Sequence, residues 1–224
     1  MKKLTLVVAV LAVTLFAVNA SAQEVSVGTD APGSYKKFVV GGYMGLGMAT
    51  FVGDVDDAKM RFAGEGEAYF DFYLMPILAL EAGLGFVGTG YRLLDKDFDP
   101  DLKVRYSLIN MEIPLGAKLN IHNFQISLTM VMYFILSGKI KSEAGSNESE
   151  HKLNDDDWDN IRRFNIGPKI TFGYAIPIGP VSLVPGVSWM MYLINVGKDL
   201  SGPMEDDQYR AMNIMFNIGA EFGF

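Results

Sequence analysis

The last twelve residues, NIMFNIGAEFGF (213–224), decide the fold class. From Met212 to Phe224 every even position is apolar, whereas the odd positions are mostly small or polar. Side chains of a strand alternate between its two faces. The stretch therefore predicts a strand with one apolar face and one small or polar face. A half-buried strand of a soluble sandwich would show the same alternation, so the rest of the chain must decide between them.

The same alternation recurs along the chain. In NMEIPLGAKLN (110–120), for example, Ile113 and Leu115 share one face while Glu112 and Lys118 share the other. Two stretches alternate less cleanly, 38–51 and 181–195, but their flanking turns and their β-branched and aromatic content favour strands. The chain is predicted to form eight strands: 38–51, 61–73, 78–91, a strand that includes 110–120, 124–136, 163–176, 181–195 and 210–224.

The connections between these strands alternate between long and short. They cover 53–60, 74–76, 94–102, 120–123, 139–161, 177–180 and 197–208. Transmembrane barrels have short periplasmic turns, longer outer loops and an even number of strands. A closed sheet also pairs every backbone group within lipid. The predicted fold is all-β: an eight-stranded antiparallel up-and-down transmembrane β-barrel over 38–224. A soluble lipocalin-like barrel, with its apolar face inside, is the alternative.

The N-terminal residues predict export. Lys2 and Lys3 precede an apolar run over 4–18, and Ala20-Ser21-Ala22 follows with small residues at the cleavage positions. This is the pattern of a secretory signal peptide over 1–22, cleaved after Ala22. A transmembrane helix would need about 20 apolar residues. Residues 23–37 are expected to form a periplasmic N-terminal segment, and the mature protein is expected in the outer membrane.

Charge and composition exclude several classes of function. The formal charge of −7 becomes −9 once Lys2 and Lys3 leave with the signal peptide, which argues against a nucleic-acid partner. The chain has no cysteine, and so no disulfide and no thiolate chemistry. We expect no cofactor.

The polar face of the strands predicts a charged lumen. Eight strands enclose a space just wide enough for side chains. The inward charges, with Arg61 among the bases, are nearly balanced. We therefore expect a mutually paired network whose members are Glu65, Glu67, Asp71, Glu81, Arg105, Glu112, Lys118, Arg163, Lys169 and Glu221. A register slip of one residue would turn Glu112 and Lys118 toward lipid, where a lysine near the midplane costs about 2–4 kcal/mol. A proton or ion relay through these charges is the alternative interpretation.

The sequence gives only weak evidence for a metal site or a catalytic site. Asp155, Asp157 and Asp159 have the spacing of the first ligands in a calcium loop, but Asn160 replaces the turn glycine and Ile166 the bidentate glutamate. A solvated acidic loop is favoured over a metal site. His122 and His151 have no serine or carboxylate placed as a nucleophile–base pair would require, so we expect no enzyme activity.

Two stretches resemble a known family. SLINMEIPLGAKLN (107–120) and FNIGPKITFGYAIPIGPVSLVPGVSWMMYLINV (164–196) resemble the outer-membrane β-barrel families of Bacteroidota, including PorT-like proteins. By size the chain is also similar to OmpX-type and OmpA-type barrels. The resemblance implies an eight-stranded barrel and, for the PorT branch, a role in protein secretion. The last strand, with Phe216, Phe222 and Phe224, resembles the signal by which the barrel-assembly machinery recognises its substrates.

The functional expectation follows from these features. The chain is expected to be a monomeric, non-enzymatic, closed-lumen barrel with an envelope-structural or surface-interaction role through its acidic outer loops. Its expected partners are outer-membrane lipid, lipopolysaccharide, the assembly machinery and a protein bound at the loops. The alternative is a narrow pore or an accessory subunit of a transport or secretion complex.

Overall fold

The computed structural model describes residues 36–53, 60–94, 102–144, 147–153, 161–194 and 209–224. Among these residues there is no helix long and apolar enough to cross a membrane. The predicted signal peptide 1–22 and the acidic residues 155–159 lie outside the described ranges, as does the predicted periplasmic segment 23–37 except for its last two residues.

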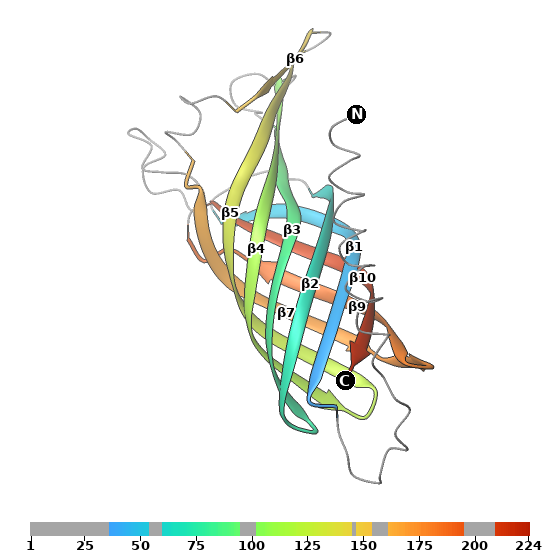
Figure 1. Ribbon diagram of the computed structural model, residues 1–224. Coiled ribbons are helices and arrows are strands. Elements are labelled where there is room, and N and C mark those ends of the chain that lie inside the picture. Colours follow the sequence, from blue (N-terminus) through green and yellow to red (C-terminus); the bar gives the residue numbers. More distant parts are fainter. Residues whose placement is uncertain (1–35, 54–59, 95–101, 145–146, 154–160, 195–208) are drawn as a thin grey trace.

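Eight strands form a closed ring (Figure 1). Each strand pairs antiparallel with its neighbours in the order β10-β1-β2-β3-β4-β5-β7-β9, and β9 pairs with β10 to close the ring. The ring strands are β1 (Phe38–Gly53), β2 (Arg61–Met75), β3 (Leu78–Leu94), β4 (Leu102–Ile121), β5 (Phe124–Ala144), β7 (Phe164–Tyr174), β9 (Val181–Met191) and β10 (Tyr209–Gly223). Two short strands add to it: β6 (Asn147–Lys152) pairs with β5, and β8 (Ile176–Ile178) pairs with β9. The predicted fold class is confirmed.

The first and last strands meet along their whole length. Their register runs from Val39 opposite Gly223 to Gly53 opposite Tyr209. At the end of this seam Phe38 and Phe224 exchange two backbone hydrogen bonds of 3.0 and 2.8 Å, and their rings stack with centroids 5.9 Å apart. The backbone groups of the last residue are thus part of the ladder.

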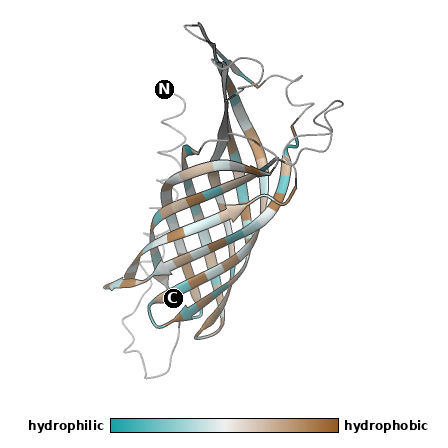
Figure 2. Ribbon diagram, turned by 180° about the vertical axis from the view of Figure 1, so that it is seen from behind, coloured by the Kyte–Doolittle hydropathy of each residue, from teal (hydrophilic) through white to brown (hydrophobic). Residues whose placement is uncertain are grey.

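The two faces of the wall differ as predicted. Apolar and polar residues alternate along the strands (Figure 2). Phe216 and Ile218 are 71% and 57% exposed on the outside, whereas Glu112 and Lys118 are 0% and 3% exposed inside. The apolar face therefore points outward, which excludes the lipocalin-like arrangement.

The lumen is divided along its axis. The charged half lies toward the short connections β2–β3 and β4–β5, and the half toward the long connections is filled by a mostly apolar plug, in which Thr89, Asn110, Asn165 and Asn213 are also buried. The apolar members of this plug are Ala49, Ala63, Val87, Leu108, Val131, Tyr133, Ile135, Met190, Tyr192, Ala211 and Met215. Because side chains fill the plug, the strands enclose a packed core at this level.

Two neighbouring strands are much longer than the wall requires. β4 and β5 have 20 and 21 residues, against 11 each for β7 and β9, and with β6 they rise above the ring in Figure 1. The sequence analysis placed a polar loop over 139–161, which is wrong for the described residues up to 144 and for 147–152. These residues lack apolar alternation, and ion pairs such as Lys139–Glu150 support the hairpin instead.

Candidate functional site: two lysine clusters in the lumen

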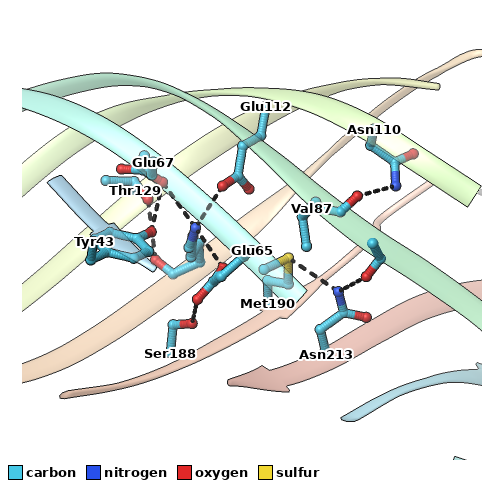
Figure 3. A network of polar contacts seen from close by, with 12 residues as sticks. Tyr43, Glu65, Glu67, Val87, Asn110, Glu112, Thr129, Ser188, Met190 and Asn213 are labelled. Atoms are coloured by element: carbon cyan, nitrogen blue, oxygen red, sulfur yellow. Dashed lines mark hydrogen bonds and ion pairs between the residues drawn. The ribbon is translucent and has the colours of Figure 1, made fainter. Parts of the chain in front are cut away.

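The first cluster is centred on Lys169 of β7. Its ammonium nitrogen lies 2.9 Å from Glu67 Oε2, 3.0 Å from Glu112 Oε1 and 3.2 Å from Glu65 Oε2. Figure 3 shows these three carboxylates converging from β2 and β4. Two hydroxyls complete the Lys169 cluster. Tyr43 donates to Glu67 and Ser188 donates to Glu65, each at 2.7 Å.

The second cluster is centred on Lys118 of β4, closer to the short connections. Its ammonium nitrogen lies 2.6 Å from Asp71 Oδ2, 3.0 Å from Glu221 Oε1 and 3.2 Å from Glu81 Oε2. The side chains that complete the Lys118 cluster are Tyr69 and Gln125, which donate to Glu221, and Ser127, which donates to Glu81, all at 2.7 Å.

The two clusters share one design. Each has one lysine, three carboxylates, a serine and a tyrosine whose ring lies near the ammonium group. Lys118 Nζ is 4.2 Å from the Tyr69 ring centroid and Lys169 Nζ is 5.2 Å from that of Tyr43. Because an isolated buried charge is strongly unfavourable, removal of either lysine would leave three carboxylates uncompensated.

Glycines make room for the carboxylates. A Cβ added at Gly85 would lie 2.8 Å from Glu112 Oε1 and 2.7 Å from the carbonyl oxygen of Gly66. A Cβ at Gly45 would collide with Asn217 Oδ1 and would also lie 2.9 Å from the Glu65 side chain. Both distances are shorter than a normal van der Waals contact. The glutamate side chains therefore fit only because glycine has no Cβ at these two positions.

Two arginines predicted for the network lie elsewhere. Arg105 pairs with Glu143 at 2.9 Å on the long β4–β5 extension. Even-numbered residues of β4 face the lumen, as the burial of Glu112 and Lys118 shows, so odd-numbered Arg105 belongs to the opposite face. Arg163 is exposed and precedes the first residue of β7.

The expected near-balance of charge is therefore wrong. Within the described lumen each cluster sets three carboxylates against one ammonium group, a formal charge of −2 when all four groups are ionised. The other eight predicted members do lie in the lumen. Each cluster contains four of them, one lysine and three carboxylates.

Tyr43 and Ser188 were not among the predicted site residues. Both lie on inward positions of strands whose alternation is irregular, since 38–51 is rich in glycine and 181–195 is apolar on both faces. A hydroxyl at an inward position of a barrel strand was the available signal, but it does not identify the acceptor.

The remaining candidates are three acidic residues of the third long connection, the aromatic residues of the last strand and His122. Asp155, Asp157 and Asp159 lie outside the described residues, and within those residues no group of three or more potential ligands is arranged to hold a metal ion. Phe216 is exposed on the outer wall. Phe222 and Phe224 lie 6.2 Å apart, centroid to centroid, at the end of the β1–β10 seam. His122 occupies the β4–β5 turn with φ of 57°.

Comparison with known proteins identifies the family of this chain. The family described as "Outer membrane protein beta-barrel domain" matches residues 20–195, well over half of the chain. No curated protein matches the sequence significantly. Among solved structures, Neisserial surface protein A is 11% identical, with 84% of this chain and 97% of that chain covered and a TM-score of 0.40.

Two further solved structures have similar scores. Ail of Yersinia pestis is 11% identical over 83% of this chain and 99% of its own, with a TM-score of 0.40. OprG of Pseudomonas aeruginosa is 11% identical over 87% and 100%, with a TM-score of 0.39. On the family match over residues 20–195, this chain belongs to the outer membrane protein beta-barrel domain family and is an outer-membrane protein.

Proposed function

We propose that this protein is a non-enzymatic, closed-lumen barrel that acts at the cell surface and does not conduct ions. The filled lumen carries this proposal. In the plug the rings of Tyr133 and Tyr192 lie 4.5 Å apart, and both residues are fully buried together with Met190 and Met215. An ion would have to cross this packed layer, where the buried amides of Asn110 and Asn213 are already hydrogen-bonded to the barrel.

The charged half of the lumen also supports a structural role. The ammonium groups of Lys118 and Lys169 are each held by three carboxylates at 3.2 Å or less. Charges held this tightly rigidify the interior and offer no open path. A relay or a narrow pore would need a continuous route that bypasses both the clusters and the plug.

The surface role is supported by the β4–β5–β6 extension. Outer loops of such barrels are the longer connections, so we place this extension outside the cell. Its residues are polar and charged, with ion pairs Arg105–Glu143 and Lys139–Glu150. Contact with lipid does not favour such a polar sheet, whereas contact with solvent, lipopolysaccharide or a protein partner does.

A conductance measurement tests the closed lumen. Purified protein inserted into planar bilayers is expected to give no single-channel currents, with a general porin as the positive control for insertion. Steady currents of a single amplitude would contradict the closed lumen and favour the narrow-pore alternative.

A crosslinking experiment tests the surface role. A photoreactive residue at exposed Ser149 of β6 is expected to give protein or lipopolysaccharide adducts in intact cells. The same residue at Phe216, on the outer wall, is the matched control and should label lipid. Adducts with inner components of a secretion complex would favour the PorT-like accessory role. Adducts of neither kind would leave only an envelope-structural role.

Assembly and oligomeric state belong to the same proposal. We expect a monomer, since the ring closes within one chain and needs no second copy. We also propose that the aromatic end of β10, with Phe222 and Phe224, is read by the barrel-assembly machinery. Its exposed Phe224 ring lies at the short-connection end, which faces the periplasm in barrels of this kind.

A further inference from the structure

A small cavity lies in the lumen between the two lysine clusters. Its volume is about 30 Å³. Tyr43 of the Lys169 cluster borders it on one side, and Tyr69, Glu81 and Lys118 of the Lys118 cluster border it on the other. The ring centroids of Tyr43 and Tyr69 lie 6.1 Å apart. The cavity therefore lies where one cluster ends and the other begins.

Asn217 of β10 lines this cavity and has no hydrogen-bond partner among the described residues. It is 8% exposed, and both its amide nitrogen and its carbonyl oxygen are unsatisfied. Almost all buried polar groups in folded proteins are hydrogen-bonded to protein or to ordered water. An amide left with both an unused donor and an unused acceptor beside a cavity indicates an occupant that can both accept and donate.

The surrounding charges define the occupant further. Lys118 and Glu81 both line the cavity, and their charged groups pair with each other at 3.2 Å. Because the two opposite charges are already paired, neither selects an ion, which favours a neutral occupant. A metal ion would satisfy only the oxygen of Asn217, and an anion only its nitrogen. Water is the smallest neutral molecule with both functions, and it needs about 10–15 Å³ on this measure of volume.

We propose that this cavity binds one or two ordered water molecules, which join the Lys118 and Lys169 clusters through Asn217 into one hydrogen-bonded network. The water accepts from the Asn217 amide group and donates to its carbonyl oxygen and to neighbouring acceptors. The apolar plug ends the network on the side of the long connections. The two clusters then respond together when either is perturbed. The proposal rests on the geometry of the lumen and does not depend on the surface role.

Water-edited NMR on isotope-labelled protein in lipid bilayers tests this site. Magnetisation is expected to pass from water protons to the side-chain amides of Asn217 and of Gln125, which also lines the cavity. The internal control is Asn165, which is fully buried, donates to Ile194 O and accepts from Ile166 N and Ile194 N. Its amide should receive no transfer. A wild-type Asn217 amide as dry as that of Asn165 would overturn the proposal.

Two variants locate the water. Asn217→Leu is expected to reduce water transfer at Gln125 to the level of Asn165, while the ammonium signals of Lys118 and Lys169 persist. Thr171→Val removes another polar lining group at nearly constant volume and should weaken the transfer if Asn217→Leu fails to fold. Undiminished transfer at Gln125 in the folded variant would contradict the site. Shifts of the Asn217 signals when Na⁺ is replaced by Cs⁺ at constant ionic strength would identify a cation and overturn the assignment to water.

Discussion

In the lumen a single positively charged residue compensates the charge of several buried carboxylates. Lys169 alone compensates three carboxylates that come from two other strands. Removing one partner of a buried ion pair leaves an uncompensated charge, which typically costs about 3–5 kcal/mol. The hydroxyls of Tyr43 and Ser188 cannot replace a positive charge.

Lys169→Met is therefore expected to lower the free energy of unfolding by about 3–5 kcal/mol. Denaturant unfolding from lipid vesicles measures the change. Lys139→Met is the matched control, because its pair with Glu150 is exposed and such pairs contribute about 0–1 kcal/mol. Equal effects of the two substitutions would show that the cluster does not depend on its lysine.

Glycine at position 85 is required by the Glu112 side chain. Gly85→Ala is expected to destabilise the barrel by about 1–3 kcal/mol, since its Cβ would meet both Glu112 and the Gly66 carbonyl. Gly88→Ala is the control on the same strand, where the nearest atoms lie 3.5 Å away, an ordinary contact. Thermal unfolding of both variants makes the comparison. A milder effect at Gly85 than at Gly88 would contradict the packing argument.

Glu150, on the extension beyond the wall, has a perturbed acidity. A hydrogen bond and the charge of Lys139 lower the pKa of the Glu150 carboxyl below its ordinary value. Since the folded-state pKa is depressed, the pairing is complete above the ordinary pKa and is lost as the pH falls through the lowered value. NMR titration of the carboxyl carbon should give this lowered midpoint, and Lys139→Met should restore the ordinary one. An unchanged midpoint in Lys139→Met would exclude the assigned cause.

At the scale of elements, the closing seam between β1 and β10 is held by more than its ladder. Phe38 stacks on Phe224 and also on Phe70 of β2, with centroids 5.9 and 5.7 Å apart. Aromatic pairs contribute about 0.5–1.5 kcal/mol beyond the area that they bury. The same ring therefore links three consecutive strands of the ring at its short-connection end.

Phe38→Ala is expected to speed unfolding more than Phe124→Ala does. Among the residues that the structure describes, Phe124 contacts one ring, that of Tyr174 at 5.0 Å, away from the seam, and it is the matched control. Unfolding rates in detergent at several temperatures provide the measurement. If the two variants unfold at the same rate, the seam is not the weak point of the ring.

The strands of the β4–β5–β6 extension could not be predicted from the alternation of apolar and polar residues. The alternation of apolar and polar residues identifies strands only where one face meets lipid or a core. Beyond the wall neither condition holds, so Lys139–Ala144 and Asn147–Lys152 looked like loop although they form a ladder. The eight wall strands were predictable because lipid contact imposes the pattern on each of them.

For the whole molecule, closure makes the strands interdependent. Every strand of the ring has a partner on both sides, and in lipid an unpaired edge is strongly unfavourable. The two lysine clusters add contacts between strands that are not neighbours, such as Lys118 of β4 with Glu221 of β10. Local loss of one strand would therefore break both the ladder and the lumen.

The barrel is accordingly expected to unfold in one cooperative transition. Far-ultraviolet circular dichroism, which follows the strands, and tyrosine fluorescence, which follows the buried lumen, should give coincident midpoints. Two separated transitions would show that the charged half and the apolar plug unfold independently.

The sequence alone determined the strand number, the closed-barrel class and the side of the wall on which Glu112 and Lys118 lie. Strand alternation has a period of two, so a slip of one residue would have moved every charge to lipid. Only the tertiary structure decided which carboxylates meet which lysine. Lys118 and Glu221 are 103 positions apart, and their contact depends on how the ring closes. The cavity beside Asn217 and the excess of negative charge follow from that closure, because they depend on distances across the lumen that no single strand contains.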